Sequence, residues 1–147
     1  MSKPVPLSRN EFSVFFPVQT RWADNDIYGH VNNVTYYAYF DSVINRYLIA
    51  EGGLDIHHGN VVGFIVESKC NFFAPIAFPD ELFAGVRVKH LGNSAVTYEV
   101  GLFKAEQQES CAVGNMTHVF VERQSSRPVK IDGLLRNALS ALLTYTN

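Results

Sequence analysis

The sequence contains few cysteines and no cluster of them. Cys70 and Cys111 are the only two in 147 residues, and they lie too far apart in the chain for the spacings of metal-binding or redox motifs. We therefore expect two buried thiols in a protein of a reducing compartment. His57 and His58 are neighbours, and adjacent residues rarely bind one metal ion together, so we also expect no metal site.

Long hydrophobic runs and an excess of basic residues are also missing. No stretch reaches the ~20 apolar residues of a membrane-spanning helix, and residues 1–10 lack the apolar segment of a secretory signal peptide. Twelve Lys and Arg against fourteen Asp and Glu give a net charge of −2, whereas nucleic-acid-binding proteins usually present a basic face. We therefore expect a cytoplasmic protein with no membrane insertion and no nucleic-acid partner.

The sequence does contain enough apolar material for a folded core. Its apolar content of 47% and charged content of 18% are ordinary for a globular protein. A chain of 147 residues can bury such a core without disulfides or a metal ion. We therefore predict one domain over residues 1–147.

Hydrophobic periodicity predicts one long helix and several strands. Alternating apolar residues predict a strand over residues 12–18, and apolar residues at helical spacing predict an amphipathic helix from 34 to about 50. Asn32 or Asn33 is its expected N-cap, and the "EGG" at 51–53 its expected end. Further strands are expected within residues 61–73, 81–91, 94–103 and 111–123, followed by a short helix from about Asp132, capped by its side chain, to Leu142.

These elements predict an α+β fold. A helix with a broad aromatic face needs a large apolar surface to cover it, and a curved antiparallel β-sheet wrapped around the helix supplies one. We therefore place the helix at the centre of the fold. His90 and His118 fall within strand patterns, where we expect them to be packing residues rather than ligands.

A polar segment, "TRWADNDIYGHVNN" at residues 20–33, directly precedes the predicted helix. The start of a helix offers unpaired N–H groups and a partial positive charge, which suit an oxygen atom on which negative charge develops. Asp26 can serve there as nucleophile or as general base, and Gly29 lets the backbone approach closely. The alternative is that Asp24, Asn25 and Asp26 only form an Asx turn and a helix cap.

The segment "RWADNDIYGHVNNVTYYAYFD", residues 21–41, resembles the signature of the hotdog-fold thioesterases. The match is strongest with the 4-hydroxybenzoyl-CoA thioesterase-like branch, in which Asp-x-Asp, a glycine turn and an aromatic helix follow one another. The order of predicted elements is similar along nearly the whole chain, and "LGNSAVTYEVGLF" is similar to a hairpin of that family. The resemblance implies a hotdog fold and an acyl-CoA thioesterase that hydrolyses an acyl-CoA to a carboxylic acid and free CoA. It implies no cofactor, since coenzyme A is part of the substrate.

The resemblance also assigns residues to the reaction. Asp26 corresponds to the catalytic carboxylate, with Asp24 as its orienting or structural partner. The backbone amides around Gly29 to Val31 would be the oxyanion donors. Asn33, like Asn32, would cap the helix, donate a hydrogen bond to the thioester carbonyl, or both.

The stretch "HVNN" at residues 30–33 is similar to the plant acyl-carrier-protein thioesterases. In those relatives the histidine of this stretch is catalytic together with an asparagine two residues earlier. Here Tyr28 occupies the earlier position, so the pair is incomplete. His30 is then either catalytic or an orienting residue, and Tyr28 can donate a hydrogen bond to the substrate or to Asp26.

The substrate needs further contacts. The CoA phosphates require basic side chains, and the candidates are Arg87, Lys89, Arg123, Arg127 and Lys130. The acyl group requires an apolar slot, for which Phe64, Phe72, Phe73 and the aromatic helix face are the candidates.

Members of the family pair their sheets edge to edge, with active sites at the subunit junction, so we expect a homodimer or homotetramer. The apolar stretch 61–66 is the predicted edge, and Glu67, Ser68 or Lys69 of the partner subunit would join the site. Two functional alternatives stay open: a thioesterase acting on acyl carrier protein, and a non-catalytic acyl-CoA-binding protein.

Overall fold

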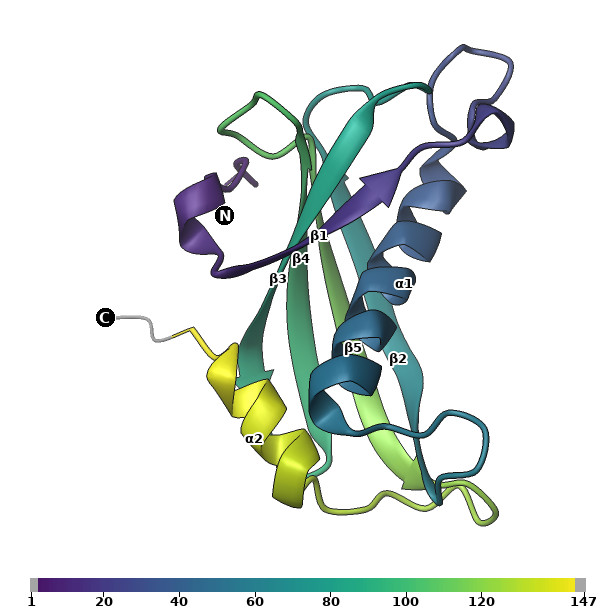
Figure 1. Ribbon diagram of the computed structural model, residues 1–147, viewed down its shortest axis with the longest axis vertical. Coiled ribbons are helices and arrows are strands. Elements are labelled where there is room, and N and C mark those ends of the chain that lie inside the picture. Colours follow the sequence, from purple (N-terminus) through teal and green to yellow (C-terminus); the bar gives the residue numbers. More distant parts are fainter. Residues whose placement is uncertain (1–2, 145–147) are drawn as a thin grey trace.

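A computed structural model describes residues 3–144 of the chain. Five antiparallel strands form one sheet in the order β1-β3-β4-β5-β2, and the long helix α1 lies across one face of it (Figure 1). This arrangement confirms the predicted α+β fold, a curved sheet wrapped around a central helix. The elements are η1 (Arg9–Glu11), β1 (Val14–Gln19), η2 (Trp22–Asp24), α1 (Asn33–Gly52), β2 (Val61–Phe72), β3 (Glu81–Leu91), β4 (Ala95–Lys104), β5 (Ala112–Glu122) and α2 (Gly133–Ala141).

Both ends of α1 follow the chemistry that the sequence indicates. Asn32 is the N-cap, and its side chain accepts a hydrogen bond of 3.0 Å from the amide of Val34. Gly53 ends the helix in the left-handed conformation, with φ at 67°. On the helix, Tyr36 and Tyr39 are buried, whereas Tyr37 is only partly buried.

The core lies between α1 and the inner face of the sheet. Alternate residues of β3, β4 and β5 point toward the helix, as the period of a strand requires. Phe40 of α1 packs so closely on β5 that a Cβ atom at Gly114 would lie 2.4 Å from its ring, so only glycine fits there. The buried inward-facing residues of the three strands are Leu82, Ala84, Val86, Val88, Val96, Tyr98, Val100, Leu102, Ala112, Met116, His118 and Phe120.

The short helix α2 packs on the C-terminal half of α1. The Tyr47 hydroxyl donates a hydrogen bond of 2.6 Å to the backbone oxygen of Ala138 and so links the two helices. The predicted side-chain cap of α2 is wrong, because Asp132 occupies the N-cap position without a side-chain hydrogen bond to the helix. Its backbone oxygen instead accepts from the amide of Arg136 at 3.3 Å.

Strand β2 forms an open edge of the sheet. Within residues 3–144 it pairs only with β5, and a bulge between Ile65 and Glu67 shifts its register. The exposed large apolar side chains Phe64, Ile65 and Val66 lie at this bulge, with Val66 60% exposed. An unpaired strand with exposed apolar side chains is prone to pair with another chain.

His118 lies under α1 on the inner face of β5 and is 2% exposed, so its prediction as a packing residue is confirmed. Its Nδ1 atom lies 3.0 Å from the hydroxyl of Tyr98, which is also buried. Burial lowers the pKa of His118 to about 4, and the nearby Asp41 carboxylate opposes this shift only in part. His90, by contrast, is exposed on β3, so the packing role predicted for it is wrong.

The free energy of unfolding should fall as the pH is lowered from about 6.5 to 4. Folding lowers the pKa of His118 from its ordinary 6.5 to about 4, so between these values the unfolded chain binds a proton that the folded chain excludes. The loss should reach about 3 kcal/mol by pH 4. Urea denaturation of the wild type and of His118→Gln at several pH values measures it. Between pH 6.5 and 4, the free energy of unfolding of the variant should fall by about 3 kcal/mol less than that of the wild type. An equal fall in both proteins would show that His118 is not the cause.

Candidate active site

The polar segment forms the loop between β1 and α1, and the Asp24 carboxylate holds this loop together. Asp24 is only 2% exposed. Its carboxylate accepts from the Tyr39 hydroxyl at 2.6 Å, from the Arg21 amide at 2.8 Å and from the Arg21 guanidinium at 3.1 and 3.2 Å. The Asn32 amide donates to the Asp24 backbone oxygen at 2.9 Å. Asp24 therefore links the start of the loop, the end of the loop and the helix.

The environment of Asp24 also fixes its charge. Burial raises the pKa of this carboxyl, but the hydrogen bonds from Tyr39 and Arg21 outweigh burial and hold the pKa below its ordinary value. Burial and the hydrogen bond to Asp24 raise the pKa of the Tyr39 hydroxyl well above its ordinary value. Asp24 is thus a charged structural residue with all of its bonding capacity used within the loop and the helix.

Asp26 lies in a tight turn just before the N-terminus of α1, a place called here the mouth of the helix. Its amide donates to the His30 oxygen at 2.9 Å, and the Gly29 amide donates back to the Asp26 oxygen at 3.0 Å. Gly29 has a φ of 84°, a conformation that favours glycine. The half-buried Asp26 carboxylate accepts one hydrogen bond through Oδ1, from the Tyr28 amide at 2.9 Å. Its Oδ2 has no hydrogen-bond partner in the described part of the chain. Asp26 therefore forms the Asx turn through Oδ1, and its Oδ2 remains available to a ligand.

The free amide donors differ in part from those predicted. The Gly29 amide is used within the turn, and the buried Val31 donates its amide to the Ile76 oxygen at 2.7 Å. Neither is a free oxyanion donor. Among residues 3–144, the amides of His30 and Asn33 have no acceptor, and both lie at the positive end of α1. The side chains of His30 and Asn33 are exposed beside them.

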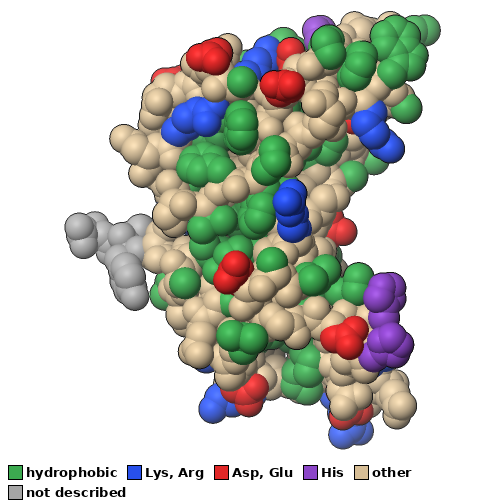
Figure 2. Space-filling view, in the orientation of Figure 1, with side chains coloured by type: hydrophobic (Ala, Val, Ile, Leu, Met, Phe, Trp, Pro, Cys, Tyr) green, Lys and Arg blue, Asp and Glu red, His purple; other side chains and the backbone are tan. Residues whose placement is uncertain are grey.

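Large apolar side chains near Asp26 in the sequence are exposed to solvent. Trp22, Ile27, Tyr28 and Val34 are all exposed, and Ile27 is 94% exposed. Figure 2 shows hydrophobic side chains gathered at the upper corner of the molecule, where this loop lies in Figure 1. Such a patch around a polar group is typical of a surface that another molecule covers.

Two of the predicted phosphate-binding residues lie on the outer face of the sheet and are already paired. The Arg87 guanidinium donates to the Glu99 carboxylate at 2.8 Å and to the Glu11 backbone oxygen at 3.2 Å. The Lys89 ammonium lies 3.8 Å from Glu99. The single Glu99 carboxylate therefore compensates one of these two positive charges, and both side chains face away from α1.

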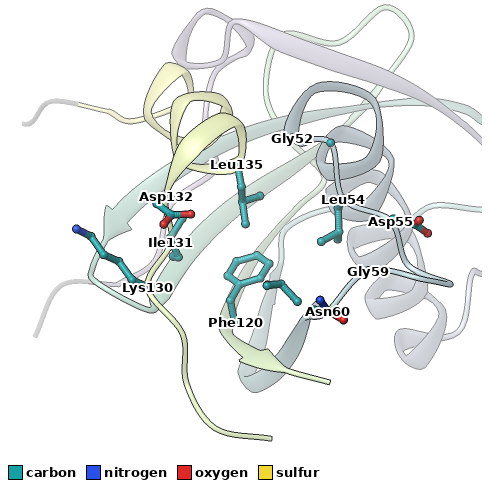
Figure 3. A pocket seen from close by; sticks show the side chains of 12 residues that line it. Gly52, Leu54, Asp55, Gly59, Asn60, Phe120, Lys130, Ile131, Asp132 and Leu135 are labelled. Carbon is teal, nitrogen blue, oxygen red and sulfur yellow. The ribbon is translucent and has the colours of Figure 1, made fainter. Parts of the chain in front are cut away.

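The other basic candidates lie at the opposite end of the molecule from Asp26, beyond the ~30 Å length of α1 (Figure 1). The Arg123 guanidinium donates to the backbone oxygens of Ile56 and Gly59 at 2.7 and 2.8 Å. Arg127 is exposed in the loop after β5. Lys130 lines a cavity of about 220 Å³ at the C-terminal end of α1 (Figure 3). One chain alone therefore does not bring these residues to Asp26.

The three phenylalanines proposed for the acyl slot lie on different faces. Phe72 points toward α1, where its ring lies 4.9 Å from that of Tyr36 in the first turns of the helix. Phe64 and Phe73 lie on the other face of the sheet, because the register places Phe64 beside the outward-facing Val119 and Phe73 follows Phe72. Only Phe72 is thus near the mouth of α1.

Two further properties concern residues 3–144 only. No three His, Cys, Asp or Glu side chains come together there in a way that could hold a metal ion. No helix in that range combines the length and the apolar character needed to cross a membrane.

The fold and the loop motif agree with known proteins. A sequence profile of the thioesterase-like superfamily matches residues 20–139. The chain belongs to this superfamily. The resemblance found in residues 21–41 is thereby confirmed, and with it the hotdog fold.

Three relatives illustrate the range of similarity. The PA5185 protein of Pseudomonas aeruginosa strain PAO1 has a solved structure, is 55% identical, and superposes with a TM-score of 0.95 over 97% of this chain and 100% of its own. YsmA of Bacillus subtilis strain 168 is 26% identical over 121 residues, which are 82% of this chain and 81% of that protein. Slr0204 of Synechocystis, a 1,4-dihydroxy-2-naphthoyl-CoA thioesterase, is 18% identical with a TM-score of 0.78 over 87% of this chain and 96% of its own, a likeness of fold alone.

The two aspartates of the motif should differ sharply in their effect on stability. Asp24→Ala should lower the free energy of unfolding by about 3 kcal/mol, because it leaves the buried Tyr39 hydroxyl and the Arg21 amide without their acceptor. Asp26→Ala, the matched control, loses one hydrogen bond at a half-exposed turn and should cost less than about 1 kcal/mol. Urea denaturation compares the two, and a larger loss for Asp26→Ala would refute the division of roles.

Proposed function

We propose that the protein is an acyl-CoA thioesterase that hydrolyses an acyl-CoA to a carboxylic acid and free CoA. The observation that carries the proposal concerns the short segment before α1: within residues 3–144, Oδ2 of Asp26 and the amides of His30 and Asn33 all lack a hydrogen-bond partner. Membership of the thioesterase-like superfamily supports it, as does the shared fold of Slr0204, a thioesterase acting on an aryl-CoA.

The geometry suits the charge that develops during hydrolysis. The thioester oxygen becomes an oxyanion, and the two free amides at the positive end of α1 can donate to it. Asp26 then acts in one of two ways. As general base it takes a proton from the attacking water; as nucleophile it forms a mixed anhydride, which water opens to the acid and the carboxylate. In both cases the thiolate leaves and takes up one proton.

A second copy of the chain completes the proposed site. Two β2 edges can pair antiparallel through their backbone N–H and C=O groups, which would bring the exposed side chains of residues 64–66 to the interface. A two-fold axis near Val66 places the start of one β2, Val61, opposite the end of the other, Phe72, which lies at the mouth of α1. The loops at the far end of one subunit then approach Asp26 of the other. Arg123, Arg127 and Lys130 of the partner subunit become available for the CoA phosphates.

The carrier of the acyl group is a separate question. The "HVNN" stretch favours acyl carrier protein as an alternative carrier, because the plant thioesterases for that carrier contain it. Tyr28, in place of their asparagine, favours coenzyme A. Turnover of the same acyl group on the two carriers should therefore be faster with coenzyme A. A third possibility, binding without hydrolysis, predicts tight acyl-CoA binding and no thiol release.

Asp26→Asn should lower turnover of acyl-CoA esters at least ~100-fold, the scale expected for loss of a catalytic base. Thiol release followed with Ellman's reagent across aromatic, short and long acyl-CoA esters provides the measurement. Asp41→Asn removes an exposed carboxylate of α1 outside the site and serves as the matched control with near-normal turnover. Retention of near-normal turnover by Asp26→Asn would place the chemistry elsewhere, for example on His30.

Disruption of the β2 edge should remove both assembly and activity. Val66→Lys places a charge at the centre of the proposed interface, so we expect a monomer with little turnover. Val5→Lys alters an equally large and similarly exposed valine, 68% against 60%, and should leave the wild-type assembly intact. Sedimentation at micromolar concentration distinguishes the species. A monomeric wild type, or an assembled Val66→Lys, would contradict the proposal.

A further inference from the structure

A groove of about 370 Å³ lies between the edge strand β1 and α1, on the side of the helix away from β2. Its floor is largely apolar, and arginine is the only charged residue type that lines it. In Figure 1 the end of β1 lies beside the N-terminal part of α1, and the groove is lined by residues of both elements. The lining residues are Pro17, Val18, Gln19, Arg21, Thr35, Ala38, Tyr39, Ser42, Val43 and Arg46. An apolar floor with basic groups and no carboxylate is complementary to an anion that carries an apolar chain.

Arg46 supplies the uncompensated charge of this groove. Its guanidinium lies over the ring of Phe16, 5.3 Å from the ring centre, and Phe16 in turn contacts Tyr47. Within residues 3–144 this guanidinium has no carboxylate or carbonyl partner. Most other arginines of that range are tied to acceptors, as Arg87 is to Glu99. The aromatic ring positions Arg46 while its N–H donors stay free for a ligand.

Arg21 marks the other end of the groove and differs from Arg46 in its charge balance. Its Nε and Nη2 atoms donate to Asp24, so the charge of Arg21 is compensated while Nη1 remains free. Thr35 near this end and Arg46 at the other are eleven residues apart on α1, which corresponds to ~16 Å along the helix. The groove therefore presents one net positive charge and an apolar path leading away from it.

We propose that this groove binds a medium-chain fatty acid, with the carboxylate on Arg46 and the chain along Val18, Ala38 and Val43 toward Arg21. One uncompensated guanidinium matches one carboxylate, which it can bind through two parallel hydrogen bonds. The choice of a carboxylate over another anion rests on the proposed function, since hydrolysis of an acyl-CoA releases a fatty acid or similar acid. Asp26 does not line the groove, whereas Arg21 and Tyr39, which do, donate hydrogen bonds to Asp24 in the loop before α1.

Titration of the ¹⁵N-labelled full-length protein with sodium decanoate below its micellar concentration tests the proposal. Amide resonances of Val18, Ala38, Ser42 and Val43 should shift together. Arg46→Gln should weaken the affinity at least about tenfold, the expected effect of one charge-assisted contact. Lys3→Gln, which removes the positive charge of an exposed residue outside the groove and outside the proposed site, should leave the affinity unchanged. Decan-1-ol, which lacks the charge, should bind at least about tenfold more weakly than decanoate.

Three results would overturn the proposal: no binding of decanoate, shifts confined to the loop around Asp26, or equal affinity of the wild type and Arg46→Gln. Arg46→Lys should retain an intermediate affinity, because it keeps the charge but not the planar donor pair. The Asp26→Asn variant separates this proposal from the proposed function. It should bind decanoate in the groove as the wild type does, whether or not the wild type hydrolyses thioesters.

Discussion

The buried carboxylate of Asp24 is the interaction on which the candidate site depends. Three segments meet at Asp24. Arg21, just after β1, and the Tyr39 hydroxyl of the helix donate to its carboxylate, and the Asn32 amide at the start of α1 donates to its backbone oxygen. A buried carboxylate is tolerated only when its acceptor capacity is used, and the donors of Arg21 and Tyr39 use it. The loop between them is thereby short and fixed, and it presents Asp26 at the positive end of α1.

The sequence predicts the features that depend on local chemistry. The period of the apolar residues, Asn32 as N-cap and Gly53 as stop define α1, and the Asp-x-x-Gly spacing places Asp26 at its mouth. The role of Asp24 also had a local signal, because Arg21 lies three residues earlier and can pair with it. The burial of Tyr39 also had a local signal in the sequence, since Tyr39 follows Tyr36 at helical spacing. Its hydrogen bond to Asp24 does not follow from periodicity.

Features that depend on strand register or on contacts between distant segments could not be predicted from the sequence. The bulge between Ile65 and Glu67 and the outward direction of Phe64 are set by pairing with β5, so the predicted acyl slot mixes two faces of the sheet. The ion pair between Arg87 and Glu99 is a cross-strand contact between β3 and β4. The separation of Arg123 from Asp26 by the length of α1 appears only in the assembled fold. That separation, together with the open β2 edge, is the reason to propose a site shared by two subunits.

The central claim is that Asp26 of one subunit works with the basic far end of the other, and subunit mixing tests it most directly. Asp26→Asn and Arg123→Ala are each prepared alone, then unfolded together and refolded. In mixed dimers one site carries both substitutions and the other carries neither, so about a quarter of wild-type turnover should return in a statistical mixture. A mixture no more active than the two variants measured separately would contradict the shared site.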